Sequence, residues 1–193
     1  HSMGSFVTRS YISKYAEDVD GAVICGTSGK NPAADIGIML ANAVAKIKGA
    51  RYRSKFIDSM AFGTYNKKFD GNTGFEWLSK NEENIKKYVA DEKCGYLFSA
   101  SAFADLFSLL KEVSSDECFD KTPKNLPLYL IAGDMDPVGN YGKGVKEVYE
   151  RYKATAHNVQ IKLYPSLRHE IHNELEKEEI YKDIADFALS ICK

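Results

Sequence analysis

Three short apolar segments limit the folds that this chain can adopt. Residues 21–27 (GAVICGT) and 128–133 (LYLIAG) are almost continuously apolar and end in small residues, which is typical of strands buried on both faces of a parallel sheet. In residues 159–163 apolar and polar side chains alternate, which indicates a strand nearer the edge of the sheet. Helical patterns precede, separate and follow these segments, and the first of them covers residues 3–17. We therefore expect an α/β fold with about three parallel strands and flanking helices.

Residues 31–120 contain no comparable strand pattern. Pro32 opens a helical pattern that ends at Gly49, and three further segments have helical spacing. These segments are residues 51–62, 73–89 and 100–113. The apolar face expected for the first helix consists of Ile36, Leu40, Val44 and Ile47. This helical insertion either forms a satellite core or presents an inner face to an apolar substrate, and both can hold for different faces.

The charge balance and the cysteines restrict the partners. The 193 residues carry a net charge of −1, which argues against a charge-driven nucleic-acid or membrane-surface footprint. No apolar run approaches the ~18 residues of a membrane-spanning helix. Cys25, Cys94, Cys118 and Cys192 form no CxxC pair. We therefore expect free thiols in a cytoplasmic protein that binds no nucleic acid.

The first residues fit a catalytic turn. His1-Ser2-Met3-Gly4 matches the end of the G-x-S-x-G pattern, in which a serine sits on a strained turn between a strand and a helix. A serine two residues before a glycine is common and usually structural. The remainder of the chain therefore has to supply partners for Ser2.

Two loops supply such partners. Asp136 lies just beyond the second strand segment, and His169 follows the third. An Asp-Pro pair is more often a turn and a loop histidine more often a surface residue. However, the order Ser2, Asp136, His169, with each residue after a strand, is the order of nucleophile, acid and base in α/β-hydrolases. Asp134 is the second choice for the acid.

These residue types perform acyl transfer together. A serine hydroxyl is a weak nucleophile near neutral pH until an imidazole accepts its proton. A carboxylate then holds the imidazole in the required tautomer and stabilises the imidazolium. The backbone N–H of Met3, the residue after the nucleophile, would contribute to the oxyanion hole.

Longer phrases of the sequence resemble one family. HSMGSFVTRSYI, GAVICGT, GDMDPVGNYGKGV and YPSLRHEIHNE, with FGTYNKKF, FEWLS and DEKCGYLFSASAFADL between them, are similar to lysophospholipase and monoacylglycerol-lipase-like α/β-hydrolases, which are grouped with serine aminopeptidases. The resemblance implies that Ser2 is the nucleophile, Asp136 the acid and His169 the base. It also implies three parts: residues 1–30 with the elbow helix and first strand, a helical cap at 31–120, and 121–193 with the acid and histidine loops.

The resemblance implies an activity and leaves alternatives open. The activity is hydrolysis of a small-molecule substrate, a lipid-type carboxylic ester, without a cofactor or a metal. The alternatives are a serine aminopeptidase, which needs an acidic group for the free amine of its substrate, and a non-catalytic fragment or interaction module. Such hydrolases place several strands before the elbow, so the chain resembles their C-terminal portion. The strand at 21–27 would then have an unpaired edge, and we expect a homo-oligomer, with a two-fold dimer favoured.

Two smaller predictions concern the end of the histidine segment. His169, Glu170 and His172 could suggest a metal site, but their spacing lacks the H-E-x-x-H pattern, so a catalytic histidine is the preferred interpretation. Asn173 and Glu174 could brace the histidine loop, or Asn173 could be the N-cap of the last helix. The capping interpretation is favoured.

Overall fold

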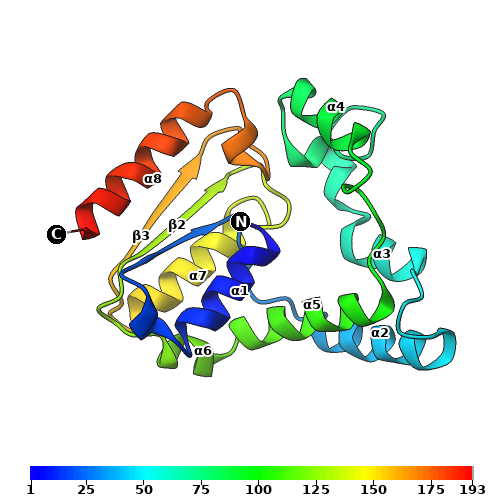
Figure 1. The fold of residues 1–193 in the computed structure, drawn as a ribbon, viewed down its shortest axis with the longest axis horizontal. Coiled ribbons are helices and arrows are strands. Elements are labelled where there is room, and N and C mark those ends of the chain that lie inside the picture. Colours follow the sequence, from blue (N-terminus) through cyan, green and yellow to red (C-terminus); the bar gives the residue numbers. More distant parts are fainter. Residues whose placement is uncertain (193) are drawn as a thin grey trace.

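A parallel sheet of three strands forms the centre of the protein. The structure, a computed structural model, describes residues 1–192. Strands β1 (Ala22–Cys25), β2 (Leu128–Gly133) and β3 (Val159–Tyr164) lie in the order β1-β2-β3, and each neighbouring pair is parallel (Figure 1). All residues of β2 are buried, because this strand lies between the other two. The predicted α/β fold with a parallel sheet is confirmed.

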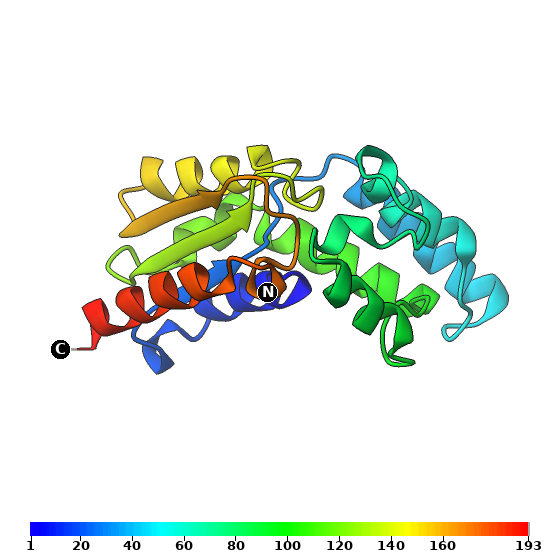
Figure 2. The same cartoon turned by 90° about the horizontal axis from the view of Figure 1, so that it is seen from above.

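Helices cover both faces of the sheet. Alternate residues of a strand point to opposite faces, so Leu128 and Leu130 of β2 pack in one cluster with α1 (Met3–Ile12) and α7 (Lys143–Ala154). Tyr129 and Ile131 pack on the other face against α8 (Lys177–Ile191). Figure 2 shows the strands between α7 and α8. The C-terminal ends of all three strands therefore open at one edge of a layered core.

The segment between β1 and β2 contains only helices and turns. Its helices begin mostly at serine or asparagine N-caps, whose side chains accept a hydrogen bond from a backbone N–H of the first turn. They are α2 (Ala34–Lys48), α3 (Lys55–Phe62), α4 (Glu82–Ala90), α5 (Ala100–Val113) and α6 (Asp116–Lys121). Among residues 1–192, no helix has both the length and the apolar composition needed to cross a bilayer.

Several helix boundaries differ from the sequence expectation. The helix expected over 3–17 ends at Ile12 and is followed by a short 3₁₀ turn. The helix expected over 73–89 is a 3₁₀ turn at Glu76–Leu78 followed by α4. The third difference is α6, which the sequence patterns missed because it has only six residues. The caps Asn81 and Ser115 mark the true starts of α4 and α6, and apolar spacing alone does not locate them.

The helices α2 to α5 and the turns between them, residues 34–113, form a cap that projects from the sheet (Figure 1). Its core joins Ala41 of α2 with Phe103 and Phe107 of α5. The expected apolar face of α2 is wrong at Ile36 and Ile47, which are exposed, whereas Val44 packs against this core. The buried face carries Ala34, Gly37 and Ala41 instead. A Cβ on Gly37 would lie 2.8 Å from the Phe107 ring, so small residues let α2 and α5 approach closely.

A buried arginine joins α1 to both ends of the cap. Arg9 is fully buried. Its Nη1 donates to the carbonyl oxygen of Ser28 (3.0 Å), where the chain leaves β1, and its Nη2 donates to the carbonyl oxygen of Val113 at the end of α5. Burial lowers the pKa of the guanidinium. Because these acceptors are backbone carbonyls, the contacts depend on the path of the chain at the two ends of the cap.

The edge of β1 pairs with no other strand among the described residues. On α1, Met3, Val7 and Tyr11 are exposed. These surfaces are the ones on which the expected homo-oligomer rests, and that assembly stays a prediction. The division of the chain into residues 1–30, 31–120 and 121–193 likewise stays a prediction.

Gly133, at the end of β2, leads to a prediction about stability. A Cβ at this position would lie 2.0 Å from the backbone oxygen of Leu167 and 2.4 Å from that of Arg168. We expect Gly133→Ala to lower the free energy of unfolding by at least the about 1–3 kcal/mol typical of overpacked cores, because backbone atoms must move. Thermal unfolding measures the change. Gly4→Ala is the control.

Gly4 lies in α1, and a Cβ there would meet no atom within 4 Å. Alanine should be neutral at this position or stabilise the helix by up to about 1 kcal/mol. If Gly133→Ala melts at the temperature of the parent protein, the backbone of the segment after β3 does not approach β2 as closely as described.

Candidate active site

Ser2 lies immediately before helix α1 and beside the C-terminal end of β1. Its backbone has φ 52° and ψ −126°, a left-handed conformation that is uncommon for residues other than glycine. The Ser2 N–H donates to the carbonyl oxygen of Cys25 (3.0 Å), which fixes the turn at the C-terminal end of β1. The Ser2 carbonyl oxygen accepts from the N–H of Ser5 (2.7 Å). Strain of this kind costs about 1–3 kcal/mol and is typical of functional sites.

Asp136 and His169 meet at the same edge of the sheet. The Nδ1–H of His169 donates to Oδ2 of Asp136 at 2.9 Å, and the carboxylate can only accept in this pair. Oδ1 of Asp136 accepts from the N–H of Val138 (2.8 Å). Asp136 is 0% and His169 3% exposed. The carboxylate is therefore oriented from both sides, and Nε2 remains the free nitrogen of the imidazole.

Asp134 occupies a different place. Its Oδ1 accepts from the N–H of Ser166 (2.7 Å) in the turn after β3. Ser166 has a positive φ of 63°, so the carboxylate stabilises an unusual turn. Of the two acids considered from the sequence, the structure brings Asp136 and not Asp134 into contact with His169.

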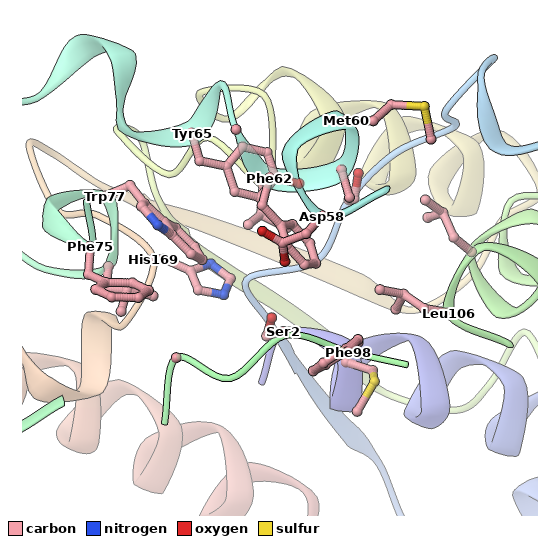
Figure 3. Close-up of a pocket in the computed structure, with 18 of the residues that line it drawn as sticks. Ser2, Asp58, Met60, Phe62, Tyr65, Phe75, Trp77, Phe98, Leu106 and His169 are labelled. Atoms are coloured by element: carbon pink, nitrogen blue, oxygen red, sulfur yellow. The ribbon is translucent and has the colours of Figure 1, made fainter. Parts of the chain in front are cut away.

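Ser2 and His169 face one cavity (Figure 3). The structure assigns no hydrogen bond between the Ser2 hydroxyl and the imidazole among the described residues. Met3 is the first residue of α1, so its N–H has no acceptor within the helix and is a donor beside Ser2. The four residues predicted from the sequence thus gather at one edge of the sheet. Their roles stay predictions.

A buried carboxylate holds the histidine loop (residues 165–176) against the cap. Glu174 is 1% exposed. Its carboxylate accepts from Ser79 Oγ (2.8 Å) and from three backbone N–H groups, those of Lys80, Asn81 and Arg168, at 3.0 to 3.2 Å. Burying a charged group is costly unless it is hydrogen-bonded, and here four donors surround one carboxylate.

The capping interpretation of Asn173 is wrong. Helix α8 begins at Lys177 with Glu176 as its N-cap residue, and the Asn173 side chain donates to Oε2 of Glu170 (3.0 Å). A 3₁₀ turn over Ile171–Asn173 occupies the segment instead. The alternative, in which this segment braces the histidine loop, describes what Glu174 does.

Further contacts join the histidine loop to the 3₁₀ turn at Glu76–Leu78. The guanidinium of Arg168 donates to the carbonyl oxygens of Glu76 (2.6 Å) and Ser79 (3.0 Å). The N–H of Glu170 donates to the carbonyl oxygen of Leu78 (2.7 Å). The Trp77 ring packs on the His169 ring with centroids 5.2 Å apart. The position of the imidazole therefore depends on the cap as well as on the sheet.

The cavity beside Ser2 is mainly apolar and has a volume of about 610 Å³, within the usual range for ligand pockets. Its floor contains Ser2, Met3 and His169, and its walls come from the cap and from α1. Aromatic and aliphatic wall residues include Phe6, Met60, Phe62, Tyr65, Phe75, Trp77, Phe98, Leu106, Phe107 and Leu110. The inner face of the cap is thus a pocket wall, while α2 and α5 also share a core of their own.

Asp58 of α3 is the feature of this cavity that the sequence patterns missed. Its side chain lines the cavity, and Figure 3 shows its carboxylate pointing toward the space above Ser2. Burial raises the pKa of this carboxyl group. The only signal in the sequence is one acidic residue in the apolar stretch FIDSMAF. Such a residue looks like part of the polar face of any amphipathic helix.

One group of possible metal ligands occurs in the described residues. Ligand atoms of His1, Cys25 and His172 lie within 4.8 Å of one another. Burial raises the pKa of the Cys25 thiol to about 12, and the protonated thiol is not a metal ligand. The group weighed from the sequence is not brought together, since Glu170 instead accepts from Asn84 (2.7 Å).

Comparisons with known proteins identify a family and related folds. Residues 1–176 match the family described as serine aminopeptidase, S33. A thermostable carboxyl esterase from Bacillus coagulans, solved with glycerol, is 28% identical with a TM-score of 0.92 over 99% of this chain and 63% of the esterase. A lipase in its open form is 24% identical, with a TM-score of 0.85 over 97% of this chain and 62% of the lipase.

A monoacylglycerol lipase from Paleococcus ferrophilus shares the fold at 18% identity, with a TM-score of 0.69 over 99% of this chain and 66% of the lipase. The chain therefore spans less than two thirds of the length of these structures. No curated protein matches the chain.

The buried Glu174 leads to a prediction with an internal control. In Glu174→Gln the side chain turns an amide N–H toward donors and loses its charge. We expect the free energy of unfolding to fall by about 1.5–3 kcal/mol, the contribution of a hydrogen bond to a charged group. Amide exchange in residues 165–176 should accelerate.

Glu176→Gln is the control. It removes an exposed ion pair with Lys80 (2.6 Å) and should lower the free energy of unfolding by at most about 1 kcal/mol. Equal effects of the two substitutions would contradict the bracing role.

Proposed function

The chain belongs to the serine aminopeptidase (S33) family, and on this basis we propose that the site hydrolyses lipid-type carboxylic esters by Ser-His-Asp acyl transfer. The observation that carries the proposal is the buried His169–Asp136 pair (2.9 Å) in one cavity with a serine held at φ 52°. This combination provides a nucleophile, a base and a group that orients the base.

In the proposed mechanism His169 accepts the Ser2 proton at Nε2 while Ser2 Oγ attacks the ester carbonyl carbon. Asp136 keeps the proton on Nδ1 and stabilises the imidazolium. The N–H of Met3 donates to the oxyanion that forms. The imidazolium then protonates the leaving alcohol, and an acyl-serine remains. Water then gives a proton to His169 and attacks the acyl carbon, the bond between this carbon and Ser2 Oγ breaks, and the imidazolium returns the proton to Oγ as the acid leaves.

The apolar walls of the cavity favour an acyl chain as the substrate part that they bind. Each buried CH₂ group contributes about 0.8 kcal/mol, so chain length should control affinity. A volume of about 610 Å³ has room for a medium-length chain. The solved relatives include a carboxyl esterase and lipases by their descriptions, which supports an ester as the substrate class.

Loss of either Ser2 or His169 should abolish activity in the full-length protein. We expect Ser2→Ala and His169→Ala each to remove nearly all hydrolysis of p-nitrophenyl esters, and the double variant to be little worse, because such residues act as a unit. Labelling by a fluorophosphonate probe should vanish in Ser2→Ala. Additive losses would contradict a shared mechanism, and a folded parent protein without labelling would favour the non-catalytic alternative.

Asp136→Asn and Asp134→Asn form a matched pair for the acid. Asp136→Asn should lower kcat by several orders of magnitude, since the wrong imidazole tautomer results. Asp134→Asn should lower stability and change kcat far less, because its carboxylate contacts only the Ser166 turn. The reverse pattern would reassign the acid.

Asp58 favours a second candidate function, that of a serine aminopeptidase. A carboxylate directed into an apolar cavity could pair with the ammonium group of a substrate, as an aminopeptidase requires. An apolar acyl chain offers no such partner. The two functions therefore make opposite predictions for the same residue.

Under the ester hypothesis, Asp58→Asn should leave turnover of p-nitrophenyl esters nearly unchanged. Under the peptidase hypothesis, it should raise KM for aminoacyl-nitroanilides at least tenfold, and the activity of the parent protein on anilides should fall as pH drops through the raised pKa of Asp58. Since a raised carboxyl pKa destabilises the folded state above that pKa, Asp58→Asn should also stabilise the fold near neutral pH. Preference of the parent protein for anilides over esters would contradict the ester hypothesis.

A further inference from the structure

Five cations lie close together at one corner of the cap. Residues 46–55 (KIKGARYRSK) contain five Lys and Arg and no acid. They connect the end of α2 with the start of α3. Because the whole chain has 26 cations and 27 acids, the remaining residues carry a net charge of −6. The near-neutral total thus hides a strongly basic segment in an acidic molecule.

The five cations are exposed and have no ion-pair partner in the part of the chain that the structure describes. They are Lys46, Lys48, Arg51, Arg53 and Lys55. Other exposed lysines of the cap do pair, such as Lys111 with Asp35 and Lys86 with Glu83. The charge of residues 46–55 is therefore available to an external partner.

Large apolar side chains are interleaved with these cations. Ile47 is 76% and Phe56 67% exposed, and Tyr52 and Tyr96 are also exposed. The guanidinium of Arg53 lies over the Tyr96 ring, 6.0 Å from its centroid. Ile47 and Phe56 are apolar side chains in water beside charges that also lack partners. A partner that contacts both the apolar side chains and the cations must present apolar and anionic groups on the same surface.

The corner lies at the outer end of the cap, and its apolar surface continues to the mouth of the cavity. Figures 1 and 2 show the connection between α2 and α3 far from the sheet. Ile36 and Met60, on the same two helices, are exposed and also line the cavity. Along α2, residues 36, 39, 43 and 47 share one helix face by their spacing, and Ile36, Met39 and Ile47 of this face are exposed.

We propose that the α2–α3 corner binds the surface of a bilayer that contains anionic lipids. The cations meet the lipid phosphates, each contributing about 1 kcal/mol near such a surface. Ile47 and Phe56 enter the boundary between headgroups and acyl chains, as the apolar face of an interfacial helix does. A nucleic-acid duplex or a soluble anion would satisfy the charges and leave these two side chains in water. The proposal concerns where the protein docks and does not depend on its catalytic reaction.

Vesicle co-sedimentation of the full-length protein tests the proposal. We expect binding to phosphatidylcholine vesicles with 30% phosphatidylglycerol, little binding to pure phosphatidylcholine, and loss of binding in 0.5 M NaCl because of screening. The triple variant Lys46→Gln, Lys48→Gln, Lys55→Gln should bind about a hundredfold more weakly. Ile47→Ser with Phe56→Ser should also weaken binding. The triple variant Lys86→Gln, Lys87→Gln, Lys93→Gln on and after α4 makes the same charge change elsewhere and should bind like the parent protein.

Other outcomes would overturn the proposal. No binding to anionic vesicles, or equal loss of binding in both triple variants, would remove the special role of the corner. Competition by millimolar inorganic phosphate would indicate a soluble anion site, and tighter binding to duplex DNA than to vesicles would indicate a nucleic-acid partner. Circular dichroism and thermal melting check that each variant folds.

Discussion

The carboxylate of Glu174 connects the cap with the histidine loop, and the site needs both of these parts in place. It is nearly without contact to water, and a charged group in that position is tolerated only when hydrogen bonds replace its hydration. Three of its four donors belong to the cap and one to the histidine loop itself. The histidine loop is therefore held in place by residues 79–81 of the cap. The imidazole of His169 is held between Asp136 on the sheet side and Trp77 on the cap side.

The sequence predicts the sheet and the order of Ser2, Asp136 and His169 because these features are local. A buried parallel strand is a continuous apolar run, and β2 shows it without interruption. The end of such a strand locates the next loop, so the acid and histidine segments could be placed without knowledge of tertiary structure. The choice of Asp136 over Asp134 agrees with the contact to His169.

What the sequence did not reveal depends on contacts between distant segments. Arg168 and Glu174 have no special pattern, and their partners lie some ninety residues earlier in the chain. The buried face of α2 consists of small residues chosen by the approach of α5, so a search for large apolar side chains selects the wrong face. The net charge of the chain hides a local feature in a similar way, because a sum over all residues does not record that five cations share ten positions.

The fixed ends of the cap have a consequence for its length. Arg9 holds the chain where it leaves β1 and again where it leaves α5, so the residues between these points form a loop closed at its base. The entropy of closing a loop changes slowly with its size, by about 0.6 kcal/mol for each doubling. Insertions or deletions within the cap should therefore disturb the sheet little, provided that both ends still reach the guanidinium. The segment at Glu76–Leu78 is the exception, since the histidine loop relies on its backbone.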